Sequence, residues 1–480
     1  MARKLSELVR RDLAQDPEIS GVTADSRKVR PGWLFAALPG TKVDGRAFAK
    51  QALAQGAAAV IAEAEIEDAS APTIVTPDPR RAYALAAAAY FGAQPDVCVA
   101  VTGTNGKTSV ATFCRQIFTR LGRKGASMGT LGVRTADEQL TPAGLTTPDA
   151  ADVAELLSEL VGKGVTHLAL EASSHGIDQR RLDGVKLTAA GFLNLTQDHL
   201  DYHGTMEAYL AAKLRLFETL LTRGGTAVLN ADSDAYPAFA AAAVQAGHTV
   251  FSVGENGQGL KLIAREPTPE GQQLIIEAGG RTFDVSLPLV GGYQASNALV
   301  AAGLCIATGE EVAEVLEALS YLEGAPGRLE RVGRGPDGGE AYVDYAHTPD
   351  GLETVLSALR PHARGRLLVV FGAGGDRDRG KRPIMGEIAV RLADLAIVTD
   401  DNPRSEDPAA IRAEILGGAK GAREIGDRRA AIRAAVAELR DGDVLIVAGK
   451  GHEEGQTIGS VVHPFNDVIE VREALEGDRG

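Results

Sequence analysis

The 480-residue sequence contains little cysteine and no excess of positive charge. Its cysteines, Cys98, Cys114 and Cys305, are scattered without the spacing of metal ligands, so we interpret them as buried thiols in a reducing compartment. Lys and Arg total 50 against 64 Asp and Glu, which gives a formal net charge of −14. A field of this sign does not attract a polyphosphate backbone, so we expect no nucleic acid partner and only local phosphate sites.

Long hydrophobic runs are also lacking. The sequence has no stretch of about 18 apolar residues, and the Ala-rich residues 82–89 are too few to span a bilayer. The first 13 residues mix charges with an apolar face, which predicts an amphipathic helix rather than a secretory signal. We therefore expect a cytoplasmic protein without membrane insertion.

The composition is that of a soluble protein long enough for about three domains, with 44% hydrophobic and 24% charged residues. Gly- and Pro-rich turns suggest boundaries that give domains at 1–95, 96–326 and 327–480. Strands and helices alternate in each of them, apart from an expected antiparallel insertion near 260–289. The pattern predicts an α/β protein with a small N-terminal domain, a central parallel sheet and a C-terminal Rossmann-like doubly wound sheet.

The strongest chemical signal is TGTNGKTS at residues 102–109, between an apolar strand and a helix. Glycines let backbone N–H groups approach phosphate oxygens, Lys107 supplies positive charge, and Thr108 can bind Mg²⁺. The usual phosphate loop has glycine where this chain has Val101, so the motif is a shortened G-x-x-G-K-T variant. It predicts a P-loop ATPase sheet that binds ATP or GTP, and the flanking elements argue against a chance glycine-rich turn. The expected nucleotide contacts are Gly103, Thr104, Asn105, Gly106, Lys107, Thr108 and Ser109.

Two polar clusters follow later strands of the central region. In LEASSHG (170–176), Glu171 would lie beside the phosphate loop and bind Mg²⁺ if the two strands are neighbours. The alternative is a helix cap with a solvated histidine. In NLTQDHLDYHG (194–204), two His and two Asp fall within six residues, and a metal site and a capped turn remain equally open. Lys213 has no local signal and by default is a lysine on a helix surface.

The C-terminal region carries polar residues at the ends of its apolar strands. DNPR (401–404) and GKGHE (449–453) follow two such strands, and Arg377 lies in a basic loop after a third. At one edge of a sheet these segments would offer both charges needed to hold a zwitterion. Arg328, after a Gly-Ala-Pro-Gly turn, is either a phosphate contact or part of a structural ion pair.

Taken together, the motifs stand in the order found in the Mur ligases. TGTNGKTS, LEASSHG, NLTQDHLDYHG, LVGGYQASNALVAAG, GAPGRLE, VDYAHTPD, FGAGGDRDRGKRPIMG, DDNPR and VAGKGHE span nearly the whole chain. They resemble most the type that adds the third, diamino residue of the peptidoglycan stem to UDP-N-acetylmuramoyl-L-alanyl-D-glutamate. The resemblance implies an N-terminal domain for the UDP end, a central ATPase and a C-terminal domain for the incoming amino acid.

The resemblance also implies roles for individual residues. Expected UDP-sugar contacts are Ala24, Ser26, Thr41, Lys42 and Val43. Expected muramoyl-dipeptide contacts are Thr146, Thr147, Ser173, Gln179 and Arg181. Expected ligands of two Mg²⁺ ions are Thr108, Glu171, His199 and Lys213, since Lys213 falls on the lysine that the family carbamylates. The nucleotide would also contact Asn297, Arg328 and Asp344. The expected contacts of the diamino acid are Arg377, Asp401, Asn402, Pro403, Arg404, Gly449 and Glu453.

The implied reaction activates a carboxylate with ATP. The D-glutamate γ-carboxylate attacks the γ-phosphate to give an acyl phosphate and ADP, and the incoming amine then displaces phosphate. The residues expected to act in catalysis are Lys107, Glu171, His199, Lys213 and Arg328. Acyl phosphate must be shielded from water, so the C-terminal domain is expected to close over it.

The identity of the diamino acid is the main open choice. In the family an Arg in the DNPR motif goes with meso-diaminopimelate, whose distal carboxylate it can clamp, while L-ornithine and L-lysine remain alternatives. A different amide ligase on this scaffold, such as folylpolyglutamate synthase, is a further alternative, as is a nucleotide-binding switch without enzymatic activity. We expect the protein to be a monomer.

Overall fold

The computed structural model describes residues 2–40, 44–268 and 270–477. It divides into two compact units. Unit 1 comprises the chain up to residue 261 together with 299–315, and unit 2 comprises 262–298 and the chain from 316 onward. Three elements cross the division: the strand β14 (Leu260–Thr268) and the helices α10 (Gly292–Ala307) and α11 (Val312–Ala318). The three-domain division at 1–95, 96–326 and 327–480 stays a prediction.

The N-terminal part of unit 1 is built on a parallel sheet of order β3-β4-β5-β6. Its strands are β3 (Gly21–Thr23), β4 (Trp33–Ala36), β5 (Ala59–Ala62) and β6 (Thr73–Val75). The other elements are β1 (Arg3–Lys4), α1 (Leu5–Val9), β2 (Glu18–Ile19), η1 (Gly45–Phe48), α2 (Ala49–Ala54) and α3 (Pro79–Phe91). The helix expected over the first 13 residues is shorter than predicted, because Arg10 takes a left-handed φ of 52° and ends α1.

The phosphate-loop motif lies at the end of the central strand of a second parallel sheet. The order β13-β12-β11-β7-β10-β8 places β7 (Val97–Thr102) between β10 (His167–Glu171) and β11 (Leu187–Phe192). The other parallel strands are β8 (Gly125–Gly129), β12 (Leu221–Asn230) and β13 (Thr249–Gly254), and β9 (Gly132–Arg134) pairs antiparallel with β8. The helices are α4 (Lys107–Arg120), α5 (Ala150–Gly162), α6 (Ser174–Asp178), α7 (Leu200–His203), α8 (Met206–Arg215), the π-helix η2 (Leu216–Leu220), α9 (Tyr236–Gln245) and α11 (Val312–Ala318).

Unit 2 contains the antiparallel insertion and the second predicted α/β sheet. Strands β15 (Gly271–Ala278) and β16 (Arg281–Leu287) pair antiparallel, as expected. The larger sheet has the order β17-β18-β22-β19-β20-β21, in which β18, β22, β19, β20 and β21 are parallel. Its strands are β17 (Glu330–Arg334), β18 (Glu340–Asp344), β19 (Leu367–Phe371), β20 (Leu395–Val398), β21 (Arg423–Glu424) and β22 (Val444–Ala448).

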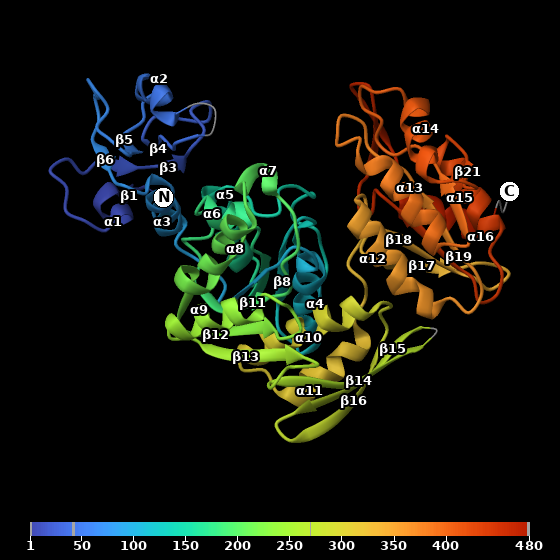
Figure 1. Cartoon of the computed structure of the whole chain (residues 1–480). Helices are drawn as coiled ribbons and strands as arrows, with labels where there is room; N and C mark the ends of the chain where they lie inside the picture. The colour runs from blue at the N-terminus through green and yellow to red at the C-terminus, as the bar shows by residue number, and fades with distance from the viewer. Residues whose placement is uncertain (1, 41–43, 269, 478–480) are drawn as a thin grey trace. The chain divides into compact units, whose positions relative to one another are not determined.

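Helices cover both faces of this sheet. Along β19, Leu367 and Val369 pack with one helix group, while Leu368 and Val370 pack with the other, because successive side chains of a strand point to opposite faces. One group is α12 (Pro349–Leu359), α13 (Lys381–Leu392) and α14 (Pro408–Gly418), and the other is α15 (Arg428–Ala437) and α16 (Asp467–Glu476) (Figure 1). The arrangement is doubly wound, as predicted.

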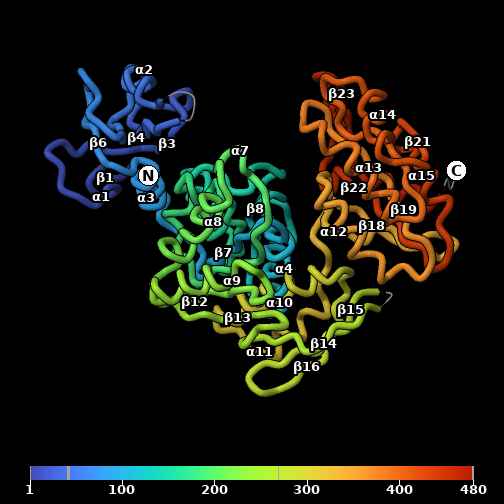
Figure 2. Tube along the Cα trace, viewed as in Figure 1, coloured from blue at the N-terminus to red at the C-terminus, as the bar shows by residue number. Residues whose placement is uncertain are grey.

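Short elements complete unit 2. They are η3 (Leu319–Tyr321), η4 (Arg360–His362), β23 (Gly455–Ile458) and β24 (Val461–Pro464). Figure 2 marks α12, β22 and β23 along the trace of this unit. Within the described residues, no helix is both long and apolar enough to cross a membrane.

Candidate active site

The phosphate-loop motif has the geometry expected of an anion-binding turn. Helix α4 begins at Lys107, directly after Gly106, whose φ of 91° lies in the left-handed region that favours glycine. Lys107 Nζ donates to the carbonyl oxygens of Gly103 at 2.8 Å and Thr104 at 2.9 Å. The backbone N–H of Asn105 donates to Asn194 Oδ1 at 2.9 Å, so the segment that follows the neighbouring strand β11 holds the loop in place.

Glu171 lies beside this loop, as its position on a neighbouring strand predicted. In the parallel pairing of β10 with β7, Glu171 stands opposite Val101, and only 3% of it is exposed. Thr108 Oγ1 donates to Glu171 Oε2 at 3.1 Å, and the backbone N–H of Thr130 donates to Oε1 at 2.9 Å. A hydroxyl and a carboxylate oxygen therefore stand together at the start of α4, and both are hard ligands of the kind Mg²⁺ prefers.

Lys213 is buried, so the default interpretation as a lysine on a helix surface is wrong. It lies on α8 with 1% exposure, and its Nζ donates to the carbonyl oxygen of Gly103 at 2.8 Å. The Nζ also lies 4.4 Å from the centroid of the Tyr209 ring. Burial, reinforced by the charge of Lys107, holds the pKa of Lys213 well below its usual value. Burial of this kind leaves no local trace in the sequence.

His199 lies in a turn rich in aromatic rings. Its φ of 53° places it in the left-handed region before α7, and Asp198 Oδ1 accepts a hydrogen bond from its backbone N–H at 2.8 Å. The ring centroid of His199 lies 4.8 Å from that of His175 and 6.2 Å from that of Tyr209. In the part of the chain that the structure describes, no three or more His, Cys, Asp or Glu side chains are arranged to hold a metal ion.

The structure brings together residues predicted to contact the muramoyl-dipeptide, in the loop after Thr146 and around α6. Thr147 Oγ1 lies 3.0 Å from Ser173 Oγ. Arg181 donates to the carbonyl oxygen of Thr147 at 2.6 Å and to Gln179 Oε1 at 2.8 Å. This cluster is continuous with Glu171, because Thr147 Oγ1 also donates to the Glu171 carbonyl oxygen at 3.0 Å.

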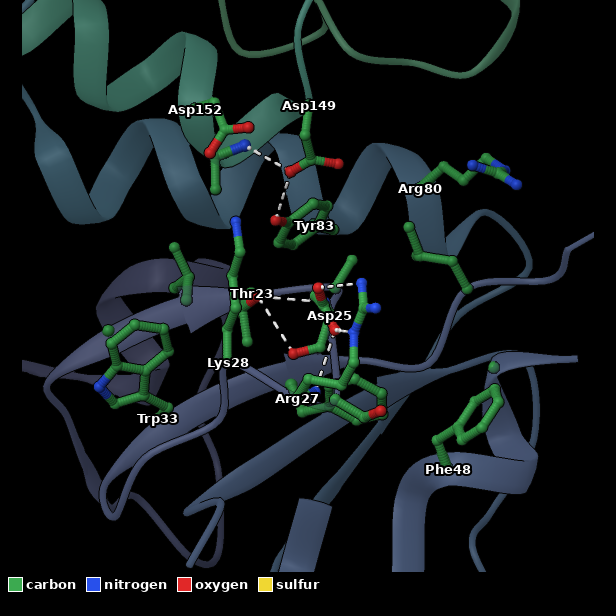
Figure 3. A pocket seen from close by; sticks show the side chains of 18 of the residues that line it. Thr23, Asp25, Arg27, Lys28, Trp33, Phe48, Arg80, Tyr83, Asp149 and Asp152 are labelled. Carbon is green, nitrogen blue, oxygen red and sulfur yellow. Dashed lines mark hydrogen bonds and ion pairs between the residues drawn. The ribbon is translucent and has the colours of Figure 1, made fainter. Parts of the chain in front are cut away.

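A cavity of about 1030 Å³ lies in unit 1 between the N-terminal sheet and the helices α3 and α5 (Figure 3). Ala24 and Ser26, both predicted UDP-sugar contacts, line it. The other three predicted contacts, Thr41, Lys42 and Val43, lie outside the described residues.

Sequence reasoning missed most of the polar lining of this cavity. Tyr83 OH donates to Asp149 Oδ1 at 2.6 Å, which joins α3 to the N-cap of α5 across the cavity wall (Figure 3). Asp25 pairs with Arg27 at 2.8 Å, and hydrogen bonds from Arg27 lower the pKa of Asp25 to about 2. Basic side chains such as Lys28 also line the cavity. Of these residues, only Asp25 and Arg27 lie next to a predicted contact, Ser26.

In unit 2, the predicted nucleotide contact Asp344 ends β18, and a second one, Arg328, precedes β17. Asp344 accepts hydrogen bonds from the backbone N–H groups of Leu329 at 2.7 Å and Ala346 at 2.8 Å, and burial raises its pKa. The Arg328 guanidinium lies 4.6 Å over the Tyr345 ring. Its buried Nε has no hydrogen-bond partner among the described residues, a state that an incoming anion would relieve.

The third predicted nucleotide contact in unit 2, Asn297, is buried on α10. Its Nδ2 donates to Gln294 Oε1 at 2.9 Å, and Gln294 Nε2 lies 3.4 Å from the carbonyl oxygen of Arg328. A single glutamine thus connects Asn297 to the segment that carries Arg328.

The DNPR and GKGHE motifs meet at one edge of the unit 2 sheet. Asn402 Nδ2 donates to Glu453 Oε2 at 2.8 Å, and a Cβ added to Gly449 would lie 2.5 Å from Asp401 Oδ2. Arg404, at a left-handed φ of 51°, donates to the carbonyl oxygen of Gly375 at 2.8 Å.

The other residues of these segments differ in how they relate to this cluster. Pro403 lies against Gly375, where an added Cβ would meet its carbonyl oxygen. Arg377 is exposed, and its described hydrogen bond goes to the carbonyl oxygen of Asp376 at 3.4 Å, so the structure does not join it to the cluster. Lys450, which sequence reasoning left without a role, is fully buried within the cluster.

Comparison with known proteins supplies the family. The sequence matches three models: the Mur ligase family catalytic domain at 18–91, the Mur ligase middle domain at 101–305, and the Mur ligase glutamate ligase domain at 327–451. It is 70% identical to the UDP-N-acetylmuramoyl-L-alanyl-D-glutamate–2,6-diaminopimelate ligase of Caulobacter vibrioides, over 99% of both chains. The chain belongs to the Mur ligase family.

Other relatives of this Mur ligase agree. The protein of the same name from Rhizobium meliloti is 56% identical over 96% of this chain and 95% of its own length. A solved structure of a ligase with that name matches with a TM-score of 0.77 and 36% identity, over 99% of both chains. A folylpolyglutamate synthase from Mycobacterium tuberculosis shares the fold alone, at 20% identity and a TM-score of 0.62, over 77% of this chain and 92% of its own. The predicted family, fold class and enzyme class, an ATP-dependent ligase that forms an amide bond, are confirmed.

Proposed function

We propose that this Mur ligase joins meso-diaminopimelate to the D-glutamate γ-carboxylate of UDP-N-acetylmuramoyl-L-alanyl-D-glutamate in peptidoglycan synthesis, with ATP as the activating substrate. The observation that carries the proposal is identity of 70% over the full chain to a relative named for this reaction. The motif residues at the sheet edge of unit 2 support the choice of amino acid. We also propose that it acts as a cytoplasmic monomer, with residues 1–95 for the UDP end, 96–326 for ATP and 327–480 for the diamino acid.

The first chemical step brings a carboxylate to a polyanion, so its barrier is largely electrostatic. The γ-carboxylate oxygen forms a bond to the γ-phosphorus while the bond to ADP breaks, which leaves an acyl phosphate. Lys107 at the start of α4 supplies positive charge, and the loop N–H groups hold the phosphate oxygens. Arg328, with its unpartnered Nε, would add a second cation, with Asn297 and Asp344 around the nucleotide.

The residues at the phosphate loop fit Mg²⁺. Thr108 Oγ1 and Glu171 Oε2 stand 3.1 Å apart and would hold one ion, and His199 and Lys213 would complete the pair of sites. Mg²⁺ would supply charge neutralisation at the phosphate oxygens.

We propose that Lys213 is carbamylated. A buried amine with a depressed pKa is neutral more often than an exposed one, and only the neutral amine can attack CO₂. The nitrogen forms a bond to carbon and releases a proton, so the side chain becomes a carboxylate able to bind a cation.

The incoming diamino acid must be recognised at its far end. Arg404 would clamp the distal carboxylate, and Glu453 would accept a hydrogen bond from the distal ammonium. Gly449 lies against Asp401, and Asn402 donates to Glu453, so the two motifs are held together around this site. L-Lysine and L-ornithine lack the distal carboxylate that Arg404 would clamp.

A phosphate-release assay tests the proposal. With UDP-N-acetylmuramoyl-L-alanyl-D-glutamate, ATP and Mg²⁺, we expect phosphate when meso-diaminopimelate is added and little with L-ornithine or L-lysine. Lys107→Ala serves as the control for phosphate released without the ligase reaction. A higher kcat/KM for L-lysine than for meso-diaminopimelate would overturn the choice of amino acid.

A further inference from the structure

A fully buried lysine stands within the proposed diamino acid site. Lys450 follows β22 and has no exposed side-chain area, although an ammonium placed away from water is costly unless it is paired. Its neighbours Gly449 and Gly451 have φ values of 122° and 55°, which L side chains rarely adopt. This backbone carries the lysine into the interior at the carboxyl edge of the sheet.

The partners of Lys450 are two residues predicted to contact the diamino acid. Its Nζ donates to Glu453 Oε2 at 2.8 Å and to Asn402 Oδ1 at 3.1 Å. Asn402 Nδ2 donates to the same Glu453 oxygen at 2.8 Å, which closes a triangle of three side chains. Asn402 Oδ1 also accepts from the backbone N–H of Thr457 at 2.9 Å, so the β23 strand fixes the amide orientation.

The triangle leaves one carboxylate oxygen of Glu453 for a ligand. Both bonds from Lys450 and Asn402 go to Oε2, while Oε1 has no hydrogen-bond partner among the described residues. The Glu453 side chain is 30% exposed, whereas that of Lys450 is inaccessible. A ligand ammonium can therefore reach Glu453 but not Lys450.

We propose that Lys450 is a positioning residue that sets the selectivity for the diamino acid by holding Glu453 and Asn402. The inference rests on the proposed function, since it assigns Glu453 to the distal ammonium. A lysine paired with Glu453 also balances part of its negative charge. The distal ammonium of L-lysine is then attracted less strongly to Glu453. The distal end of meso-diaminopimelate keeps a second contact, because its carboxylate also meets Arg404.

Lys450→Met tests the proposal because methionine keeps the length and removes the donors. We expect the KM for meso-diaminopimelate to rise about tenfold to hundredfold, the loss typical of hydrogen bonds to charged groups. The KM values for ATP and the UDP-linked dipeptide should stay within about twofold, because the Lys450 ammonium donates to two residues assigned to the diamino acid, Asn402 and Glu453. The preference for meso-diaminopimelate over L-lysine, measured as a ratio of kcat/KM values, should fall.

A double-mutant cycle separates positioning from general support of the fold. If Lys450 acts through Glu453, Lys450→Met in a Glu453→Gln background should raise the KM by less than about threefold. Lys420→Met, an exposed lysine of the same unit, should leave all constants unchanged. Equal losses for all three substrates, an undiminished effect in the Glu453→Gln background, or no change at all would overturn the proposal.

Two further measurements keep the outcomes distinct. If Lys450→Met does not fold, Lys450→Gln keeps a donor without the charge, and we expect a smaller rise in the KM with the same selectivity loss. A parent enzyme inactive with meso-diaminopimelate refutes the proposed function, and the cycle is then run with the diamino acid it accepts. An unchanged KM for that amino acid would still overturn the role of Lys450.

Discussion

Two buried lysines, one in each unit, differ in the groups that accept their hydrogen bonds. This difference, rather than burial itself, determines the chemistry open to each lysine. Lys213 has 1% exposure and Lys450 has none. Lys213 donates to a single backbone carbonyl oxygen and has the cation Lys107 nearby, while Lys450 donates to a carboxylate and an amide oxygen. In the first setting burial and a like charge lower the pKa of the lysine, and in the second the lysine is paired with a carboxylate.

The difference suggests distinct tasks in one reaction. A neutral amine beside the phosphate loop can react with CO₂ and become an anionic ligand, which is the role proposed for Lys213. A paired ammonium at the edge of the unit 2 sheet can hold a carboxylate in place, which is the role proposed for Lys450. Substitutions at the two lysines should therefore act on different kinetic constants.

Replacement of Lys213 should have the largest effect. We expect Lys213→Met to lower kcat by roughly 10²–10³-fold, the loss seen when one group that stabilises transition-state charge is removed. The KM for meso-diaminopimelate should change little, in contrast to Lys450→Met. Initial rates of phosphate release over a range of each substrate measure both constants.

A carboxylate supplied from solution provides the control for that experiment. Lys213→Ala leaves space where the carbamate would be, so added formate or acetate should restore part of kcat if a carboxylate is what the site requires. Lys107→Ala should show no such recovery. A Lys213→Met enzyme with parental kcat would contradict the role given to the buried amine.

Replacement of Glu453 should have the next largest effect. Glu453→Gln keeps the size of the side chain but loses the charge that Lys450 and the distal ammonium share, so kcat/KM for meso-diaminopimelate should fall about 10- to 100-fold. Competition between meso-diaminopimelate and L-lysine in one reaction, resolved by product mass, would show the change in selectivity. Glu454→Gln, at the exposed neighbouring residue, is the matched control and should behave as the parent. An unchanged product ratio would show that Glu453 does not recognise the distal ammonium.

Motif order and strand alternation were sufficient to predict the parallel sheets, the phosphate loop and the neighbourhood of Glu171. Glu171 could be placed because it ends a strand, and strand ends of a parallel sheet share an edge. Lys213 could not be placed from local pattern, since its burial results from packing of α8 against a loop 110 residues earlier in the chain. Lys450 stood in a motif, but which of its polar residues faces inward depends on the backbone at Gly449 and Gly451. Arg377 also lies in a motif, yet the structure leaves it exposed.

The smallest expected effect is a pH signature of Lys213 in stability. The pKa of Lys213 is lowered in the folded protein, so the unfolded chain binds more protons between the folded pKa and the ordinary value near 10.4. In that interval the free energy of unfolding should gain a contribution from this group that rises with pH, by at most about 1.4 kcal/mol per pH unit. Lys213→Met has no such proton to bind, so its stability should rise less steeply than that of the parent. Urea unfolding of both proteins in CO₂-free buffer across the alkaline range measures the difference.

With bicarbonate present the amine is blocked, and the parent curve should approach that of the variant. Parallel curves in CO₂-free buffer would mean that the buried amine keeps its proton as readily as an exposed one, and the contrast with Lys450 would then lose its physical basis.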